Sequence, residues 1–385
     1  MNNFDYIIIG AGASGLLLAD ALGKDAFFKD KQILLLDKDA KKTNDRTWCF
    51  WEKGAGQFDE IVHQQWKKIY FGGPQFSKTF EIAPYTYKML RGIDFYEHYF
   101  NRIKTYSNIT FRQETVTTVI EEDAVVSVTT SNSKYTAKKA FNSIFDYKMA
   151  SNQTKYPVLQ QHFIGWFIKA DTPIFKKDEA TFMDFSVPQK GNTRFMYVLP
   201  FSETEGLVEY TLFSQHRLPD EEYEEAIKAY LKNTLHCASF EITDTEKGSI
   251  PMTCYHFWER NTKDIMHIGM AGGWAKASTG YTFMSSAKKV PKIIGFLKSG
   301  KPFSELNLKN KFWYYDLLFL DVLYQRNDMG HEVFQSLFKK RKPQEIFGFL
   351  GEESTLWQDV KIMSGPKPLP FIKALLKRLF RPFFS

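Results

Sequence analysis

Residues 4–37 read FDYIIIGAGASGLLLADALGKDAFFKDKQILLLD, and this stretch decides the fold. The apolar run at 5–9 is long enough for a buried strand and too short for a helix. Residues 16–22 then predict a helix, and residues 31–36 predict a second buried strand that ends at Asp37. A strand, a G-x-G-x-x-G turn, a helix and a second strand ending in an acid are the complete fingerprint of a dinucleotide-binding unit.

The residues of this fingerprint have separate expected roles. Gly10 permits the tight turn, Gly12 lets the backbone approach a pyrophosphate, and Gly15 lets the helix pack closely on the strand. The N–H groups at the start of the helix, where Ser14 lies, would receive the phosphate charge. Asp37 would accept hydrogen bonds from the adenosine ribose. This stretch therefore predicts a dinucleotide site and leaves FAD and NAD open.

Composition narrows the class of partner. The chain has 385 residues, enough for two or three lobes, and its formal net charge of +7 favours anionic surfaces. No nucleic-acid-binding motif is present, so membrane lipid is the better expectation and no nucleic acid is expected. Aromatic residues make up 16% of the chain, which suits a large apolar ligand or a membrane face but equally a Phe-rich core.

The cysteines, histidines and apolar runs bear on compartment and metal. Three scattered cysteines favour a reducing compartment, and the eight histidines lack metal-ligand spacing, so no metal site is expected. The first residues lack the pattern of a signal peptide, and no apolar run approaches the roughly eighteen residues that span a bilayer. We expect a cytoplasmic protein that lies peripherally on the inner face of the cell membrane.

The middle of the chain indicates FAD rather than NAD. Residues 85–99 have the apolar spacing of a helix, and residues 116–120 and 125–129 alternate about an acidic turn as a hairpin does. A third strand is expected at 134–137, and residues 140–146 return to the sheet. A β-meander between Rossmann strands is typical of two-domain FAD enzymes and favours FAD.

A region rich in aromatic strands follows. The predicted strands are 162–168, 181–185, 194–200 and 206–213. An acidic amphipathic helix is expected at 220–231, and residues 247–251 are expected to lead back to the first domain. Strands this aromatic suggest a sheet that roofs an apolar pocket.

The last third of the chain is expected to be mainly helical. A strand entering a glycine turn at 266–273 precedes a helix predicted from Lys276 to about Leu297, which opens through Thr279, Gly280 and Tyr281. The start of that helix and Gly272 could face an anionic flavin, or could be an ordinary helix entry. Further helices are expected at 312–326, 330–340 and 343–350, before a proline-rich break at 366–370.

The segment 371–384 alternates cations with large apolar side chains. This pattern predicts an interfacial membrane anchor, and a helix docked on the protein with its lysines in water is the alternative.

These segments predict an α/β protein with a Rossmann-type FAD-binding domain, a mainly antiparallel β-sheet substrate domain and a helical C-terminal region. The expected FAD domain is discontinuous and comprises 1–50, 85–150 and 252–300. The substrate domain comprises 51–84 and 151–251, and the helical region is 301–385.

Three charged residues with apolar or aromatic neighbours in the sequence are further candidates for cofactor binding or catalysis. Arg46 lies among aromatic residues, where it could contact the cofactor, clamp a substrate lobe or stack on a surface Trp. Glu209 lies inside an apolar strand, and Asp184 has a similar setting. A carboxyl against apolar walls has a raised pKa and can handle protons on an apolar substrate. Alternatively, each acid meets a buried arginine or tyrosine.

Several segments, taken together, resemble the FAD-dependent lycopene cyclases of the bacterial type. They lie in the family's order at 5–15, 45–51 (DRTWCFW), 161–165 (QHFIG), 182–185 (FMDF), 195–200 (FMYVLP), 207–211 (LVEYT) and 279–281 (TGY). The family's essential acid falls on Glu209. The proline often found before T-G-Y is absent here, and Met270 follows Gly269 where related flavin hydroxylases have an aspartate, which weakens the hydroxylase alternative.

The resemblance implies a reaction without net redox change. Lycopene is protonated at C2 of its ψ end, the cation closes a six-membered ring, and loss of a proton leaves a β-ionone ring. The family needs reduced FAD, with NAD(P)H as the electron donor. The resemblance implies Glu209 as general acid or base with Asp184 as a weaker second. A geranylgeranyl reductase or epoxidase-like enzyme is the nearest rival, and a flavin-binding scaffold without turnover is a more distant one.

Overall fold

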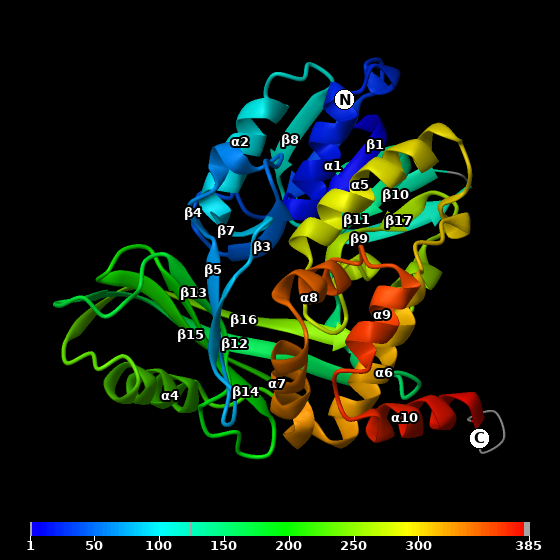
Figure 1. The fold of residues 1–385 in the computed structure, drawn as a ribbon. Helices are drawn as coiled ribbons and strands as arrows, with labels where there is room; N and C mark the ends of the chain where they lie inside the picture. Colours follow the sequence, from blue (N-terminus) through cyan, green and yellow to red (C-terminus); the bar gives the residue numbers. More distant parts are fainter. Residues whose placement is uncertain (1, 124, 381–385) are drawn as a thin grey trace. The chain divides into compact units, whose positions relative to one another are not determined.

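The computed structural model describes residues 2–123 and 125–380, and the chain divides into two compact units (Figure 1). Unit 1 comprises Met1–Trp48, Leu90–Tyr156 and Cys254–Asn310, and unit 2 comprises Cys49–Met89, Pro157–Thr253 and Lys311–Ser385. The region predicted as a separate helical part, 301–385, falls mostly within unit 2. The three-way division stays a prediction.

Unit 1 is built on a seven-stranded sheet. Six strands follow the order β8-β2-β1-β11-β10-β9, and β17 pairs with the end of β11. The pairings of β1 with β2 and β11, and of β2 with β8, are parallel, as the dinucleotide fingerprint predicts. The strand bounds are β1 Asn3–Ile9, β2 Ile33–Asp37, β8 Ile109–Gln113, β9 Val116–Glu122, β10 Val125–Thr130, β11 Lys134–Asn142 and β17 Ile265–His267.

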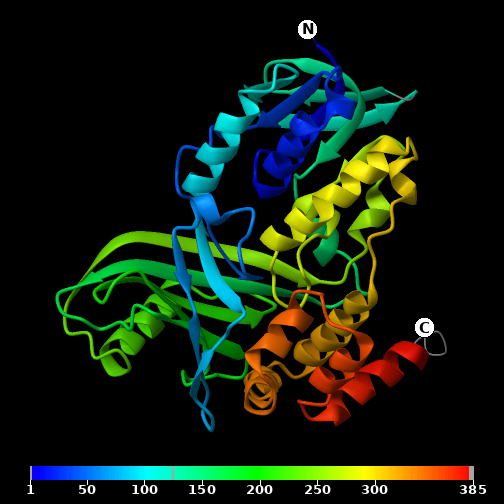
Figure 2. The same ribbon diagram turned by 45° about the horizontal axis from the view of Figure 1, so that its top comes forward.

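Three helices pack together in unit 1. Helix α1 (Ala13–Lys24) lies beside α2 (Gly92–Ile103) and α5 (Phe283–Lys298), as both ribbon views show (Figure 2). On the sheet, Ile7 and Ile9 of β1 join Leu34 and Leu36 of β2 in one buried cluster. Burial of these central strands explains their continuous apolar runs.

Three expectations for individual elements need correction. Residues 85–91 form a strand, β7 (Tyr85–Arg91), and the helix begins only at Gly92, because Tyr85, Tyr87 and Met89 alternate into a buried face. The expected strand at 134–137 and the return at 140–146 are one strand, β11. The helix predicted from Lys276 begins at Phe283, so residues 279–281 lie in the turn before α5.

Unit 2 is built on a second seven-stranded sheet of order β16-β12-β15-β14-β13-β5-β6. All of its pairings are antiparallel except that of β13 with β5. Its strands are β5 Lys68–Gly72, β6 Lys78–Glu81, β12 Val158–Ala170, β13 Glu179–Asp184, β14 Thr193–Pro200, β15 Glu205–Ser214 and β16 Phe240–Thr253. A small sheet of order β3-β7-β4 adds β3 (Thr47–Lys53) and β4 (Gln64–Trp66).

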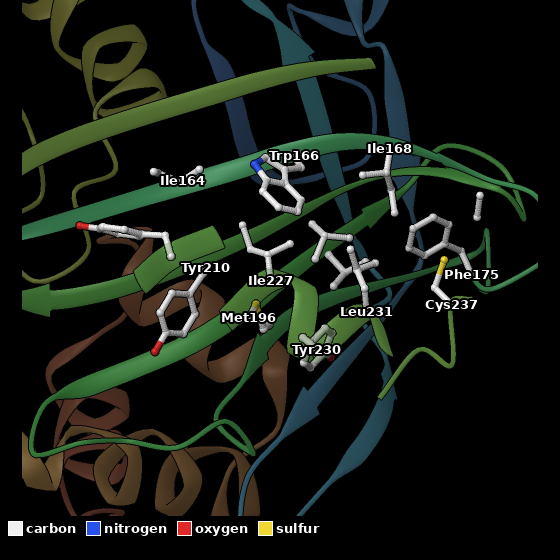
Figure 3. Packing of buried hydrophobic residues seen from close by; sticks show 14 of the residues in the cluster. Ile164, Trp166, Ile168, Phe175, Met196, Tyr210, Ile227, Tyr230, Leu231 and Cys237 are labelled. Atoms are coloured by element: carbon white, nitrogen blue, oxygen red, sulfur yellow. The ribbon is translucent and has the colours of Figure 1, made fainter. Parts of the chain in front are cut away.

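Helix α4 (Asp220–Asn233) covers one face of this sheet. Side chains of β12, β14 and β15 point toward Ile227, Tyr230 and Leu231 of α4, and together they form a buried cluster (Figure 3). The alternation along β15 sends Tyr210 into this cluster and therefore sends its neighbour Glu209 to the opposite face.

The opposite face packs on the C-terminal helices through phenylalanines. Phe185 stacks on Phe334 of α7 with ring centroids 5.5 Å apart, and Phe182 contacts Phe347 of α8 at the same separation. The helices are α6 Lys311–Gln325, α7 Gly330–Lys340, α8 Pro343–Leu350, α9 Leu356–Met363 and α10 Pro368–Phe380.

Two of these helices differ from expectation. Helix α9 was not predicted, and α10 begins at Pro368 within the stretch expected to break the pattern, since proline is well tolerated in the first turn of a helix. Residues 381–384 of the predicted tail lie outside the described residues. Among helices in 2–123 and 125–380, none has both the length and the apolar character needed to cross a bilayer.

Candidate active site

The turn between β1 and α1 has the backbone geometry that a pyrophosphate needs. Gly10 has φ +99°, a conformation that favours glycine, and a Cβ on Gly15 would lie 1.9 Å from the carbonyl oxygen of Gly10. A Cβ on Gly12, by contrast, would have no heavy atom within 4 Å. Gly10 and Gly15 therefore serve the fold, while Gly12 leaves space in front of the first turn of α1, where helix N–H groups lack intrahelical partners.

Asp37 lies at the end of β2, close to this turn. Its Oδ2 accepts a hydrogen bond from the N–H of Ala11 at 2.6 Å, and its Oδ1 accepts one from the N–H of Asp39 at 2.8 Å. Lys41 Nζ lies 3.9 Å from Oδ2. These contacts hold the carboxylate beside the glycine turn, as a ribose-binding acid requires.

Ser14 brings the second predicted cofactor segment to the glycine turn. Its Oγ lies 2.8 Å from Oγ of Ser286 on α5, and a Cβ on Gly269 would lie 2.8 Å from the same oxygen. The start of α1 and the segment leading into α5 are therefore neighbours within unit 1. Ser14 binds the protein itself here, and its cofactor role stays a prediction.

Residues 269–281 form compact turns between β17 and α5. A Cβ on Gly272 would lie 2.1 Å from the carbonyl oxygen of His267, so a side chain is excluded there. Gly280 has φ +71°, and its N–H donates to the carbonyl oxygen of Lys276 at 2.8 Å. Thr279 is buried and Tyr281 is half-buried.

Arg46 has partners for both its backbone and its side chain. Its carbonyl oxygen accepts a hydrogen bond from Gly92 N–H at 2.7 Å, which joins the segment before β3 to the start of α2. The guanidinium is largely exposed, with Nε 3.5 Å from Oδ2 of Asp45. The guanidinium also hydrogen-bonds the hydroxyl of Tyr96 on α2, and its predicted cofactor contact stays a prediction.

Unit 1 fits a dinucleotide on these observations. The glycine turn has space only at Gly12, an acid stands beside it, and the predicted residues Gly10, Gly12, Ser14, Gly15, Asp37, Gly272, Thr279, Gly280 and Tyr281 all belong to this unit.

Glu209 lies in unit 2, in the middle of β15. It is buried on the sheet face opposite α4, and Thr211, two residues along the same face, donates a hydrogen bond to its Oε1. The pKa of Glu209 is raised to about 8, chiefly by burial and further by the carboxyl of Glu246, while the hydrogen bond from Thr211 opposes the rise. Glu209 is therefore a carboxyl that stays protonated at neutral pH.

Hydroxyl and thiol groups surround this acid. Tyr197 is its direct partner across β14 and β15, and the Tyr197 and Tyr87 hydroxyls are hydrogen-bonded to each other. Cys49 of β3 hydrogen-bonds both tyrosines, and its pKa is raised chiefly by burial and further by the charges of Glu246 and Glu209. Sequence reasoning missed Tyr87, Tyr197 and Cys49, because their common place depends on pairings across two sheets.

Glu246 was also missed. Residues 247–251 were expected to be a connecting segment, but they belong to β16, an edge strand of 14 residues. The signal available in the sequence was the run of Ile and Thr residues before the glycine, which favours a strand. Much of this strand is exposed, so the apolar alternation was weak.

Asp184 lies on the other face of the same sheet. Its Oδ2 accepts a hydrogen bond from the hydroxyl of Tyr230 on α4 at 2.7 Å, and its Oδ1 accepts one from Ser186 N–H at 2.9 Å. The structure therefore does not bring Asp184 together with Glu209. Its surroundings are those of the expected alternative, a buried acid that meets a tyrosine, and its catalytic role stays a prediction.

Known proteins provide a second line of evidence. A lycopene beta-cyclase from Paracoccus sp. (strain N81106 / MBIC 01143) is 27% identical over 164 residues, which are 42% of this chain and 42% of that protein. The match thus spans about two fifths of the length of the curated relative.

Solved structures share the fold over nearly the whole chain. A geranylgeranyl bacteriochlorophyll reductase-like protein from Thermoplasma acidophilum has a TM-score of 0.60 at 11% identity, covering 97% of this chain and 98% of that one. A flavoprotein/dehydrogenase from Cytophaga hutchinsonii has a TM-score of 0.58 at 16% identity, covering 94% and 99%. A flavin-dependent brominase has a TM-score of 0.55 at 16% identity, covering 98% and 99%. The predicted fold class, that of a two-domain flavoprotein, is confirmed.

The family assignment comes from the sequence as a whole. The family model described as lycopene cyclase protein matches residues 5–376. That range contains the glycine turn, Asp37 and Glu209. The chain belongs to the lycopene cyclase protein family.

Proposed function

We propose that this protein is a lycopene beta-cyclase, which converts the ψ end groups of lycopene into β-ionone rings and so forms γ-carotene and β-carotene. The observation that carries the proposal is Glu209, a buried carboxyl with a pKa raised to about 8 in a chain of this family. Such a group is protonated at neutral pH and can donate a proton to an apolar alkene.

The reaction balances without an oxidant. A carboxyl proton is transferred to C2 of the ψ end, the electrons of a neighbouring double bond form the ring bond, and a proton then leaves so that its C–H electrons form the ring double bond. The product is an isomer of the substrate. Tyr87, Tyr197 and Phe182 pack together near Glu209 and offer ring faces that attract a cation.

Unit 1 would hold FAD through the glycine turn and Asp37, in the reduced form, with NAD(P)H as electron donor. Gly12 admits the pyrophosphate, the first turn of α1 receives its charge, and Asp37 binds the ribose. When bound, the reduced flavin would supply negative charge that stabilises the carbocation or a relay for its proton.

We also propose peripheral attachment to the inner face of the cell membrane, where an apolar substrate such as lycopene dissolves. Helix α9 exposes Leu356, Trp357 and Val360, and the side chain of Trp357 is 86% exposed. Helix α10 exposes a further set, namely Leu369, Ile372, Leu375, Leu376, Leu379 and Phe380. An exposed apolar helix face carrying lysines, here Lys373 and Lys377, is typical of an interfacial helix.

Pigment analysis tests the central proposal. Lycopene-producing bacterial cells would carry the wild-type chain, Glu209→Gln, or the matched control Glu205→Gln at an exposed position of the same strand. We expect cyclised carotenes from the wild type and the control, and lycopene alone from Glu209→Gln. Unchanged lycopene in all three, with FAD bound and reducible, would contradict the cyclase proposal.

A second candidate function is an FAD-dependent isoprenoid reductase or epoxidase-like oxidoreductase. The fold shared with a geranylgeranyl bacteriochlorophyll reductase-like protein favours it. The two functions differ in stoichiometry, since a reductase consumes one NAD(P)H for each bond reduced and a cyclase needs the donor only to keep the flavin reduced. Measured NAD(P)H oxidation per product, under anaerobic conditions, separates them.

A further inference from the structure

Glu246 and Glu209 occupy the same level of the sheet on either side of one glycine. Strand β12 lies between β15 and β16, and its residue Gly165 pairs with Glu209 on one side and with Glu246 on the other. Residues that pair directly share a face of the sheet, so both carboxyls stand on the face opposite α4. The two side chains are hydrogen-bonded to each other.

Gly165 is what allows this contact. Strands two apart in a sheet are separated by about 9–10 Å, a distance that two glutamates can bridge only over a residue without a side chain. A Cβ on Gly165 would lie 2.9 Å from Cδ1 of Leu207 and 3.3 and 3.4 Å from Cβ and Cγ of Glu209. Any other residue at position 165 would therefore place at least a Cβ atom between the two acids.

The hydroxyl and thiol groups beside the pair carry no charge at neutral pH. Thr211 on β15 donates to Glu209, while Cys49 on β3, Tyr87 on β7 and Tyr197 on β14 are hydrogen-bonded to one another next to it. Charged side chains lie farther along the same face, where Asp244 pairs with Phe167 and Glu205 pairs with Lys169. Glu209 is buried and Glu246 is half-buried. Two carboxyls in hydrogen-bond contact cannot both be ionised without strong repulsion.

We propose that Glu246 is a positioning residue that shares one proton with Glu209, so that the two carboxyls work as a single acid–base pair of net charge −1. This inference rests on the proposed function, which makes Glu209 the acid. Proton donation to the alkene leaves two adjacent carboxylates, and their mutual repulsion makes the pair a strong base. The proton released on ring closure restores the starting state, so the pair is unchanged by a complete turnover.

A titration that needs no catalysis tests the pair. The C=O stretching band of a protonated carboxylic acid is followed by infrared spectroscopy between about pH 5 and pH 10. In the wild type we expect a band that disappears near pH 8, the value to which the pKa of Glu209 is raised. In Glu246→Gln the same band should disappear about one pH unit or more lower, because the repelling charge is gone.

Two further variants sharpen the result. Gly165→Ala keeps both acids and separates them, so its band should move in the same direction as in Glu246→Gln. Glu241→Gln, an exposed position of the same strand β16, is the matched control and should titrate as the wild type does. An unchanged titration in Glu246→Gln overturns the proposal, even if Gly165→Ala fails to fold.

The pH profile of cyclisation separates this proposal from the function on which it rests. In Glu246→Gln we expect the alkaline limb of the profile to move to lower pH with the infrared titration. Cyclised product from all variants with identical profiles would remove Glu246 from its role and keep the cyclase. Shifted infrared titrations without any cyclised product would keep the pair and remove the cyclase.

Discussion

At the scale of single residues, Gly12 and Gly15 of the glycine motif have different roles, one in ligand binding and one in packing. A side chain on Gly15 would collide with the backbone of Gly10, whereas a side chain on Gly12 would enter open space at the start of α1. A substitution at Gly12 therefore tests ligand binding alone, whereas a substitution at Gly15 tests the packing of α1 on β1.

We expect Gly12→Ala to fold with wild-type stability and to bind little FAD. Gly15→Ala should instead lower the free energy of unfolding by about 1–3 kcal/mol, the usual cost of overpacking. Thermal unfolding of the flavin-free proteins and the flavin absorbance of the purified proteins check both statements. Full flavin content in Gly12→Ala would show that the pyrophosphate does not lie against this turn.

The raised pKa of Glu209 predicts a dependence of stability on pH. In the unfolded chain this acid titrates near 4.5, and in the folded chain near 8. Between these values the folded state keeps a proton that the unfolded state has lost. Its contribution to stability is present in full below about pH 4.5 and is lost as the pH rises through about 8, by up to about 1.4 kcal/mol per pH unit.

Glu209→Gln removes this dependence, so the variant should be more stable than the wild type at alkaline pH. The measurement is the midpoint of urea unfolding for both proteins at pH 5 and pH 9. Parallel losses of stability in the two proteins would mean that Glu209 is not the proton-holding group.

At the scale of elements, a register shift in β13 decides whether Asp184 lies on the same face of the sheet as Glu209. Strand β13 pairs Thr181 with Val198 and then Asp184 with Met196, so one extra residue is accommodated between them. Without that bulge, Asp184 would share a face with Phe195 and hence with Glu209. The bulge turns it to α4 instead, where Tyr230 binds it.

We therefore expect Tyr230→Phe to weaken the attachment of α4 and to leave cyclisation per folded molecule unchanged. Loss of the hydroxyl leaves a buried carboxyl short of one partner, at a cost of about 1–3 kcal/mol. Urea unfolding and pigment analysis in the same cells measure the two effects. A fall in cyclisation without a fall in stability would restore the catalytic role predicted for Asp184.

At the scale of the whole molecule, charge and apolar surface point to the same partner. The formal net charge is +7, and the exposed apolar side chains of α9 and α10 lie within unit 2. On the side of α10 that faces away from these residues, Arg378 forms two hydrogen bonds with Asp321 of α6, of 2.7 and 2.6 Å. This ion pair fixes which face of α10 is presented.

We expect the protein to bind vesicles containing phosphatidylglycerol more tightly than vesicles of phosphatidylcholine, and the difference to shrink with added salt. Trp357→Ser should weaken binding about tenfold, while Ile120→Ser, an exposed apolar position in unit 1, should not. Vesicle flotation measures both. Equal binding of all three proteins would show that α9 does not enter the bilayer surface.

Local patterns predicted the elements well, and long-range pairing accounts for most of what they missed. The β1–α1–β2 unit could be predicted because the apolar residues of each strand and of the helix follow their own period. Glu209 could be singled out because a charged residue is rare in an apolar strand. Glu246 lies 37 positions later, and its role depends on the register of three strands about Gly165. Asp184 resembled Glu209 in sequence, and a bulge that the sequence does not signal separated them.

The division into units has a consequence for biosynthesis. The chain passes from one unit to the other five times, after residues 48, 89, 156, 253 and 310, so neither unit is a continuous piece of sequence. A ribosome adds about 5–20 residues per second, so the 154 residues from the end of the second segment of unit 1 at Tyr156 to the end of its last segment at Asn310 (310 − 156) take roughly 8–30 seconds; that last segment carries β17 and α5. During that time β11 has no β17 beside it and α1 has no α5, so the nascent chain must be kept from other polypeptides until both have emerged.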